Sequence, residues 1–125
     1  MGGKATPGTR RVTVTIYHNP RCSKSRQTLA LIEDQGIAPK VVDYLKAPPT
    51  VAELKNVLKK LGLRARDIVR KSEARYASSG KERDVGDDEL LALMVENPIL
   101  IERPIVVSGD KAAIGRPPEA VLDIL

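Results

Sequence analysis

Cys22 is the residue whose type and position best suit this chain for covalent chemistry. It is the only cysteine among 125 residues, and it follows a strand-like segment at the predicted start of a helix. A thiol there faces free backbone N–H groups and the positive end of the helix dipole. Arg21, Lys24 and Arg26 add positive charge beside it. Because all these effects favour the thiolate, we expect Cys22 to titrate below about 7, against about 8.5 for a free cysteine.

The residues around Cys22 argue against simpler interpretations. A buried cysteine is usually just a small apolar residue, but arginine, serine and lysine are unusual core neighbours. Residues 22–25 read Cys-Ser-Lys-Ser, with serine in place of the second cysteine of a CxxC pair. Any redox cycle must therefore take its second thiol from another molecule. The C-x3-R spacing to Arg26 also differs from the C-x5-R phosphate loop of low-molecular-weight phosphatases.

His18, the only histidine, lies four residues before Cys22. Two interpretations fit it. It is either a turn residue that hydrogen-bonds backbone, or a group that supports the thiolate and orients the loop. One histidine and one cysteine do not make a structural zinc site, so we expect no bound metal.

Three arginines occupy unusual positions, at a predicted helix end or directly before a proline. Arg70 lies at a predicted helix end, Arg103 directly before Pro104, and Arg116 directly before Pro117. A lone arginine is usually a surface residue, and that interpretation holds for each taken singly. The two Arg-Pro steps differ, because they bracket a predicted hairpin where strands meet loops. Guanidinium groups are planar forks that suit a tetrahedral oxyanion.

The first third of the chain must position Cys22. Residues 12–17 alternate β-branched side chains and predict a strand, which a turn containing Pro20 ends. Helical spacing follows from about 22 to 35, and Gly36 ends it. Residues 40–45 predict a second strand. This order is typical of a βαβ unit with parallel strands.

A helical insert follows. Thr50 and Glu53 form a capping box ahead of a helix that Gly62 ends. We expect a short helix over 64–70, a loop over 73–86, and a helix to residue 96 capped by Asp87 or Asp88.

The last quarter returns to β-structure and carries two of the arginines. We expect a strand over 104–107, a turn over 108–110, a returning strand over 111–114, and a final helix beginning at the prolines 117–118. The predicted fold class is therefore α/β, with βαβ, a helical insert and ββα building a mixed four-stranded sheet. We expect residues 1–11 to be a flexible tail and residues 12–125 to form a single domain.

The amino-acid composition argues for some classes of function and against others. The chain is 42% hydrophobic without Phe or Trp, so its core is aliphatic. The net charge of +5 hints at anionic partners. Scarce aromatics and interspersed acidic residues argue against nucleic acid. No apolar run approaches the roughly 20 residues of a membrane span, and no secretory signal is recognisable. A lone free thiol fits the cytoplasm.

Several stretches taken together resemble the ArsC family of arsenate reductases, the glutaredoxin-coupled type on a thioredoxin-like fold. The chain is most similar to the shorter YfgD-like subgroup. The matching stretches, which span the chain from about residue 12 to its end, are 16–26, 44–45, 68–71, 97–107 and 114–125.

The resemblance implies a role for each candidate residue. Cys22 matches the nucleophile, and His18 matches the histidine that promotes the thiolate. The oxyanion-binding arginines correspond to Arg70, Arg103 and Arg116, and the cis-proline to Pro104. The implied activity is reduction of arsenate to arsenite in arsenic resistance. It has glutathione as co-substrate, glutaredoxin as partner and no bound cofactor.

Two other classes of protein are alternatives to this enzyme. Spx-type regulators share the fold, an Arg-Pro-Ile strand and a CxxC or CxxS turn, and they bind RNA polymerase instead of catalysing. Their counterpart of residues 115–117 lacks the arginine, so Arg116 favours the enzyme. A monothiol glutaredoxin-like module needs a small CGFS-like loop, whereas this loop carries Lys24 and Arg26.

Overall fold

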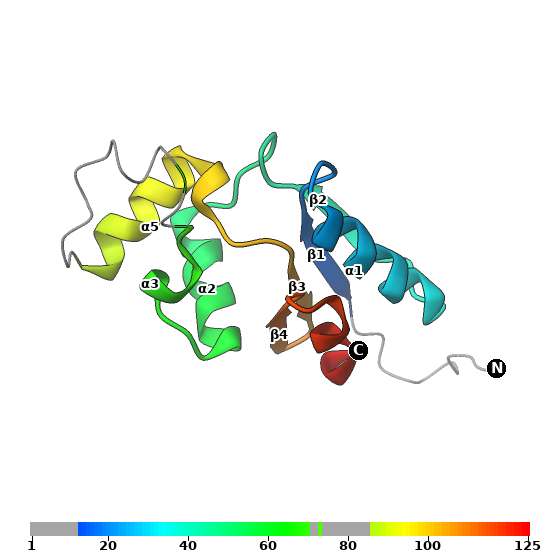
Figure 1. The fold of residues 1–125 in the computed structure, drawn as a ribbon. Helices are drawn as coiled ribbons and strands as arrows, with labels where there is room; N and C mark the ends of the chain where they lie inside the picture. The colour runs from blue at the N-terminus through cyan, green and yellow to red at the C-terminus, as the bar shows by residue number, and fades with distance from the viewer. Residues whose placement is uncertain (1–12, 71–72, 74–85) are drawn as a thin grey trace.

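The computed structural model describes residues 13–70, 73 and 86–125, and the strands in this part of the chain form one sheet. Its order is β2-β1-β3-β4 (Figure 1). The strands are β1 (Val14–His18), β2 (Lys40–Asp43), β3 (Ile105–Ser108) and β4 (Lys111–Ile114). β1 runs parallel to β2 and antiparallel to β3, and β4 is antiparallel to β3. The predicted mixed four-stranded, thioredoxin-like sheet is confirmed.

The helices follow the predicted order. α1 (Ser23–Asp34) connects β1 to β2, and the insert contains α2 (Val51–Leu61), α3 (Ala65–Ile68) and α5 (Asp87–Glu96). Two 3-10 helices, η1 (Pro98–Leu100) and η2 (Pro118–Ile124), flank the hairpin, so the predicted final helix is a 3-10 helix. The predicted tail over 1–11 and nearly all of the predicted 73–86 loop lie outside the described residues.

Two predicted helix boundaries were wrong. The helix expected over 64–70 ends at Ile68, because Val69 forms a β-bridge with Ile101 and the Arg70 N–H donates to the Leu100 carbonyl at 2.7 Å. Long-range backbone pairing thus overrides local helical spacing. The N-cap of α5 is Gly86 instead of either aspartate. Both aspartates lie in the first turn, where their charge favours the helix dipole.

The capping box of α2 forms as predicted. Thr50 Oγ1 accepts the Glu53 N–H at 3.1 Å, and Glu53 Oε1 accepts the Thr50 N–H at 2.8 Å. Gly62 ends the helix with φ +70°, a left-handed conformation that glycine adopts without strain.

The sheet is covered on both faces. α1 and η2 lie against one face, where Ile16, Ile32, Val106 and Val121 are buried together (Figure 1). The insert packs against the other face, toward which Tyr17 and other alternate strand residues point. Strand side chains alternate between faces, so adjacent residues of β1 serve two separate cores.

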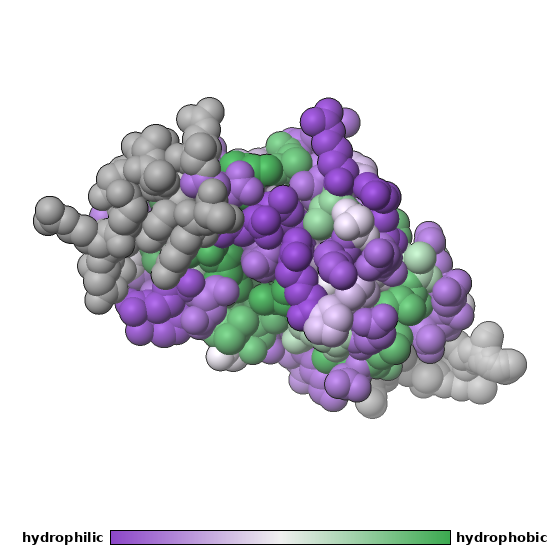
Figure 2. Space-filling view, viewed as in Figure 1, coloured by the Kyte–Doolittle hydropathy of each residue, from purple (hydrophilic) through white to green (hydrophobic). Residues whose placement is uncertain are grey.

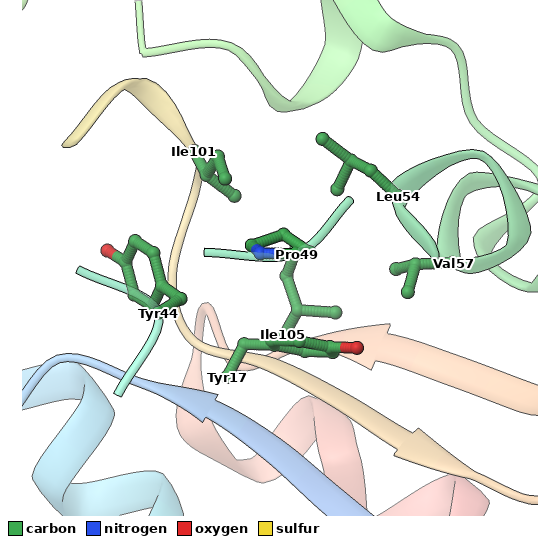
Figure 3. Close-up of a pocket in the computed structure, with 7 residues that line it drawn as sticks. All are labelled: Tyr17, Tyr44, Pro49, Leu54, Val57, Ile101 and Ile105. Atoms are coloured by element: carbon green, nitrogen blue, oxygen red, sulfur yellow. The ribbon is translucent and has the colours of Figure 1, made fainter. Parts of the chain in front are cut away.

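Between the insert and the sheet lies an apolar cavity of about 10 Å³ (Figure 3). Its lining residues are Tyr17, Tyr44, Pro49, Leu54, Val57, Ile101 and Ile105. The space is about that of one water molecule, which would find few polar partners there. This cavity is too small to hold an organic ligand.

The sheet brings three loop segments to one end. Tyr17 pairs with Ile105, and Ile105 pairs with Ile114, so the loop after β1, the loop before β3 and the loop after β4 are neighbours. The peptides Arg103–Pro104 and Arg116–Pro117 in these loops are both cis. Residues far apart in sequence therefore meet beside Cys22.

Gly115 lies at the tightest point of this end. It is buried, and a Cβ there would collide with Thr28 of α1 and would lie 2.8 Å from Pro104 Cγ. We expect Gly115→Ser to lower the free energy of unfolding by about 1–3 kcal/mol, as overpacking does. Urea denaturation measures this. Gly86→Ser is the control, since its Cβ meets nothing within 4 Å and serine is a good N-cap. Equal unfolding midpoints for wild type and Gly115→Ser would contradict the packing argument.

Candidate active site

Cys22 is the N-cap residue of α1. Its N–H donates to the Asn19 carbonyl at 2.9 Å, and its carbonyl accepts the Arg26 N–H at 3.0 Å. The backbone N–H groups of Lys24 and Ser25 favour its thiolate, although neither makes a cap hydrogen bond to the sulfur. The start of the helix therefore helps to stabilise a thiolate, as the sequence predicted.

Two of the predicted arginines reach the same sulfur. Arg116 Nη2 lies 3.6 Å from Cys22 Sγ, and the Arg103 guanidinium is near enough to lower the pKa of the thiol. One arginine comes from the loop after β4 and the other from the loop before β3. Hydrophilic side chains cover much of the region between α1 and the insert in Figure 2.

These contacts lower the pKa of Cys22. Burial alone raises the pKa of the thiol, but the Ser25 and Lys24 N–H groups, the Arg103 guanidinium and the Arg116 charge together hold it below its ordinary value. The direction agrees with the prediction, but the charges come from other residues than expected. Arg26, for example, directs its guanidinium to the Pro20 carbonyl at 2.9 Å.

Arg70 joins the group through a carboxylate that the sequence did not single out. Glu102 Oε1 lies 2.6 Å from Arg70 Nη1 and 3.1 Å from Arg116 Nε, and it accepts the Arg103 backbone N–H at 3.2 Å. Burial lowers the pKa of Arg70, but Glu102 and Glu73 outweigh it and raise that pKa. Glu102 lies within the matching stretch 97–107, but no role was expected for it, and Glu73 lies outside the matching stretches. Only the fold brings the two carboxylates to the arginines.

Glu73 is the second carboxylate of the cluster. Its Oε2 lies 3.5 Å from Arg70 Nε and 4.0 Å from Arg103 Nη1. Arg103 Nε is buried and has no hydrogen-bond partner in the described part of the chain. A buried donor of this kind costs free energy until an acceptor reaches it, so the cluster is suited to bind an anion.

His18 influences the sulfur indirectly, through Ser25. It is 7% exposed, and its Nδ1 lies 2.6 Å from Ser25 Oγ, which also accepts the Asn19 N–H at 3.0 Å. No hydrogen bond joins His18 to Cys22 among the described residues. Burial lowers the pKa of His18; Asp43 opposes this and Arg26 adds to it. His18 is therefore mostly neutral at pH 7 and steadies the segment whose Ser25 N–H favours the thiolate.

Tyr44 is another residue whose position beside the site the sequence did not indicate. It is 1% exposed, and its hydroxyl makes no hydrogen bond with the described residues. The hydroxyl points away from Leu54 and Val57 (Figure 3). Burial raises the pKa of Tyr44, while the charges of Arg103 and Arg70 oppose the rise. The nearby Asn19 side chain also lowers that pKa, although its geometry falls outside that of a hydrogen bond.

The described residues contain no group of three or more His, Cys, Asp or Glu side chains placed to hold a metal ion. They also contain no helix that is both long and apolar enough to cross a membrane.

The pKa of Cys22 is measurable from the pH dependence of alkylation by iodoacetamide. The rate rises with the thiolate fraction, so its midpoint in folded wild type should lie below that of the urea-unfolded chain. Arg116→Ala removes a stabilising charge and should move the midpoint upward. Arg21→Ala should leave it in place, because Arg21 is exposed and is not among the groups that lower this pKa. Identical midpoints in folded and unfolded protein would refute the poised thiolate.

The hydroxyl of Ser25 is expected to matter for stability. Ser25→Ala would leave the Asn19 N–H and His18 Nδ1 buried without their shared partner. We expect a loss of about 1–3 kcal/mol in the free energy of unfolding, measured by urea denaturation. Ser23→Ala, at an exposed position of the same helix, should change it by less than about 0.5 kcal/mol. A similarly small change for Ser25→Ala would show that this network does not hold the loop.

Known proteins resemble this chain over nearly its whole length. The family model described as "ArsC family" matches residues 17–124. YfgD of Escherichia coli K12 is 49% identical over 114 residues, which cover 90% of this chain and 96% of YfgD. A protein named arsenate reductase from Haemophilus influenzae is 49% identical over 116 residues, covering 91% of this chain and 100% of that protein.

A solved structure agrees with this match. The arsenate reductase from Vibrio cholerae superposes with a TM-score of 0.88 at 52% identity, covering 93% of this chain and 100% of that one. The sequence match, the shared fold and the family model lead to one conclusion: this chain belongs to the ArsC family.

Proposed function

We propose that this protein is an arsenate reductase that uses Cys22 as its nucleophile and glutathione with glutaredoxin as its source of electrons. The observation that carries the proposal is the convergence of Arg103 and Arg116 on the Cys22 sulfur from two separate loops. Relatives named arsenate reductase, about half identical to this chain, support the choice of oxyanion.

The first step joins sulfur to arsenic. The Cys22 thiolate attacks the arsenic atom of arsenate, an S–As bond forms, and one oxygen takes up protons and leaves as water. Nucleophile and substrate are both anions and repel each other. Arg103, Arg116 and Arg70 offset this repulsion and stabilise the charge that develops on the arsenate oxygens.

The reducing electrons come from external thiols, because Cys22 is the only thiol in the chain. Glutathione displaces a second oxygen as water and forms an S–As–S adduct. A glutaredoxin thiolate then attacks the glutathione sulfur and forms a mixed disulfide, and the electron pair of the broken S–As bond reduces arsenic(V) to arsenic(III). Hydrolysis of the remaining S–As bond releases arsenite and restores Cys22. The cycle needs no bound cofactor and suits a reducing compartment such as the cytoplasm.

A coupled assay with arsenate, glutathione, glutaredoxin and NADPH tests the proposal. Wild type should oxidise NADPH in an arsenate-dependent manner, and Cys22→Ser should abolish this while keeping the fold. Arg103→Ala and Arg116→Ala should each cost about 2–4 kcal/mol in kcat/KM. Lysine should rescue each in part, because it keeps the charge and loses the planar fork.

Lys111→Ala, at an exposed position of β4, is the matched control for removing a positive charge. It should leave kcat/KM unchanged. If wild type shows no arsenate-dependent turnover and instead binds RNA polymerase, the protein is a regulator of the Spx type.

A further inference from the structure

The anion-binding arginines already hold an anion that belongs to the chain. A single oxygen, Glu102 Oε1, lies 2.6 Å from Arg70 Nη1, 3.1 Å from Arg116 Nε and 3.2 Å from the Arg103 backbone nitrogen. It thus meets all three residues that the proposed function assigns to the oxyanion. The Arg116 Nε–H donates to the Arg103 carbonyl at 2.8 Å, so Glu102 meets Arg116 as an ion pair. An oxygen of bound arsenate would seek the same positive charges.

The charges of the cluster leave little attraction for a dianion. The cluster contains three guanidinium groups, the Cys22 thiolate and the carboxylates of Glu73 and Glu102, so the positive and negative charges cancel. Because these groups are partly buried, water screens them less than it would at the surface. An incoming oxyanion gains full use of Arg70 and Arg116 only when Glu102 releases them.

Glu102 can release them without any change in the fold. Its side chain is 26% exposed, so it has a path to solvent. Its backbone is fixed independently, because its N–H donates to the Ile68 carbonyl at 2.8 Å. A rotation of the side chain alone would vacate the space between the two arginines.

We propose that Glu102 is an internal competitor of the substrate for Arg70 and Arg116, and that it thereby sets the affinity and the charge selectivity of the oxyanion site. The inference rests on the proposed function for the identity of the site. Glu102 lowers the affinity for all anions, and it does so most for dianions, because repulsion grows with the charge of the ligand.

A positioning role for Glu102 predicts the opposite result. If the carboxylate only held the arginines in place, its removal would loosen them and weaken anion binding. Glu102→Gln separates the two roles, since glutamine keeps the shape and an acceptor oxygen for Arg70 but carries no charge.

The experiment measures how anions protect Cys22 from iodoacetamide at constant ionic strength. Sulfate serves as a tetrahedral dianion and perchlorate as a tetrahedral monoanion. Each rate is divided by the rate of the same variant without anion, which removes any change in thiolate reactivity. In Glu102→Gln the sulfate concentration for half-protection should fall at least tenfold, and the perchlorate concentration should fall less.

Glu33→Gln is the matched control, because it removes the same charge from an exposed position of α1. Its half-protection concentrations should equal those of wild type. Glu102→Ala, which lacks the carboxylate and leaves more space, should show the same direction as Glu102→Gln. It serves as the second variant if glutamine impairs folding.

An unchanged or higher sulfate concentration for half-protection in the folded Glu102 variants would overturn the inference. An equal gain for sulfate and perchlorate would overturn the charge-selectivity part. Failure of the proposed function is a separate result, since it appears as absent arsenate turnover by wild type in the coupled assay. The sulfate measurement still tests Glu102 in that case, because it requires no catalysis.

Discussion

Three guanidinium groups repel one another, and holding them in one cluster, with Arg103 and Arg116 at the Cys22 sulfur and Arg70 joined through Glu102, is the constraint on which this site depends. The thiolate of Cys22 and the carboxylates of Glu73 and Glu102 supply the counter-charges. Partial burial strengthens the repulsion among the arginines, and it also strengthens their attraction to each anion. Burial opposes both charged forms, but Arg103 and Arg116 help to lower the pKa of Cys22, and Glu102 and Glu73 raise that of Arg70.

The sheet fixes the backbone positions of the charged residues, and this allows so many charges to lie close together. β1 and β3 are antiparallel, so the end of one lies beside the start of the other, and the hairpin returns β4 to the same end. Close packing of Gly115 against Thr28 and Pro104 ties that end to α1. The arginines therefore need little further ordering when an anion arrives, and less of the binding free energy is lost to side-chain entropy.

The Ser25 hydroxyl holds the loop between β1 and α1 through neutral hydrogen bonds, and the Arg26 guanidinium adds a charged one to the Pro20 carbonyl. Ser25 joins His18 to the Asn19 backbone, and α1 begins at the N-cap residue Cys22. A neutral His18 stabilises the loop without adding another positive charge to the three arginines. The backbone N–H of Ser25 is the largest influence that lowers the pKa of the thiol, and its position depends on the start of the helix.

The sequence alone predicted the strand and helix order, the capping box of Thr50 and Glu53, and Cys22 at a helix start, because these depend on local spacing. It also placed both Arg-Pro steps at the ends of a hairpin. Local spacing cannot predict pairs formed between distant segments. Tertiary structure decided three such features: the Val69–Ile101 bridge that shortens α3, the carboxylates that face Arg70, and the arginine contact to the sulfur. They arise only when the sheet brings those segments together.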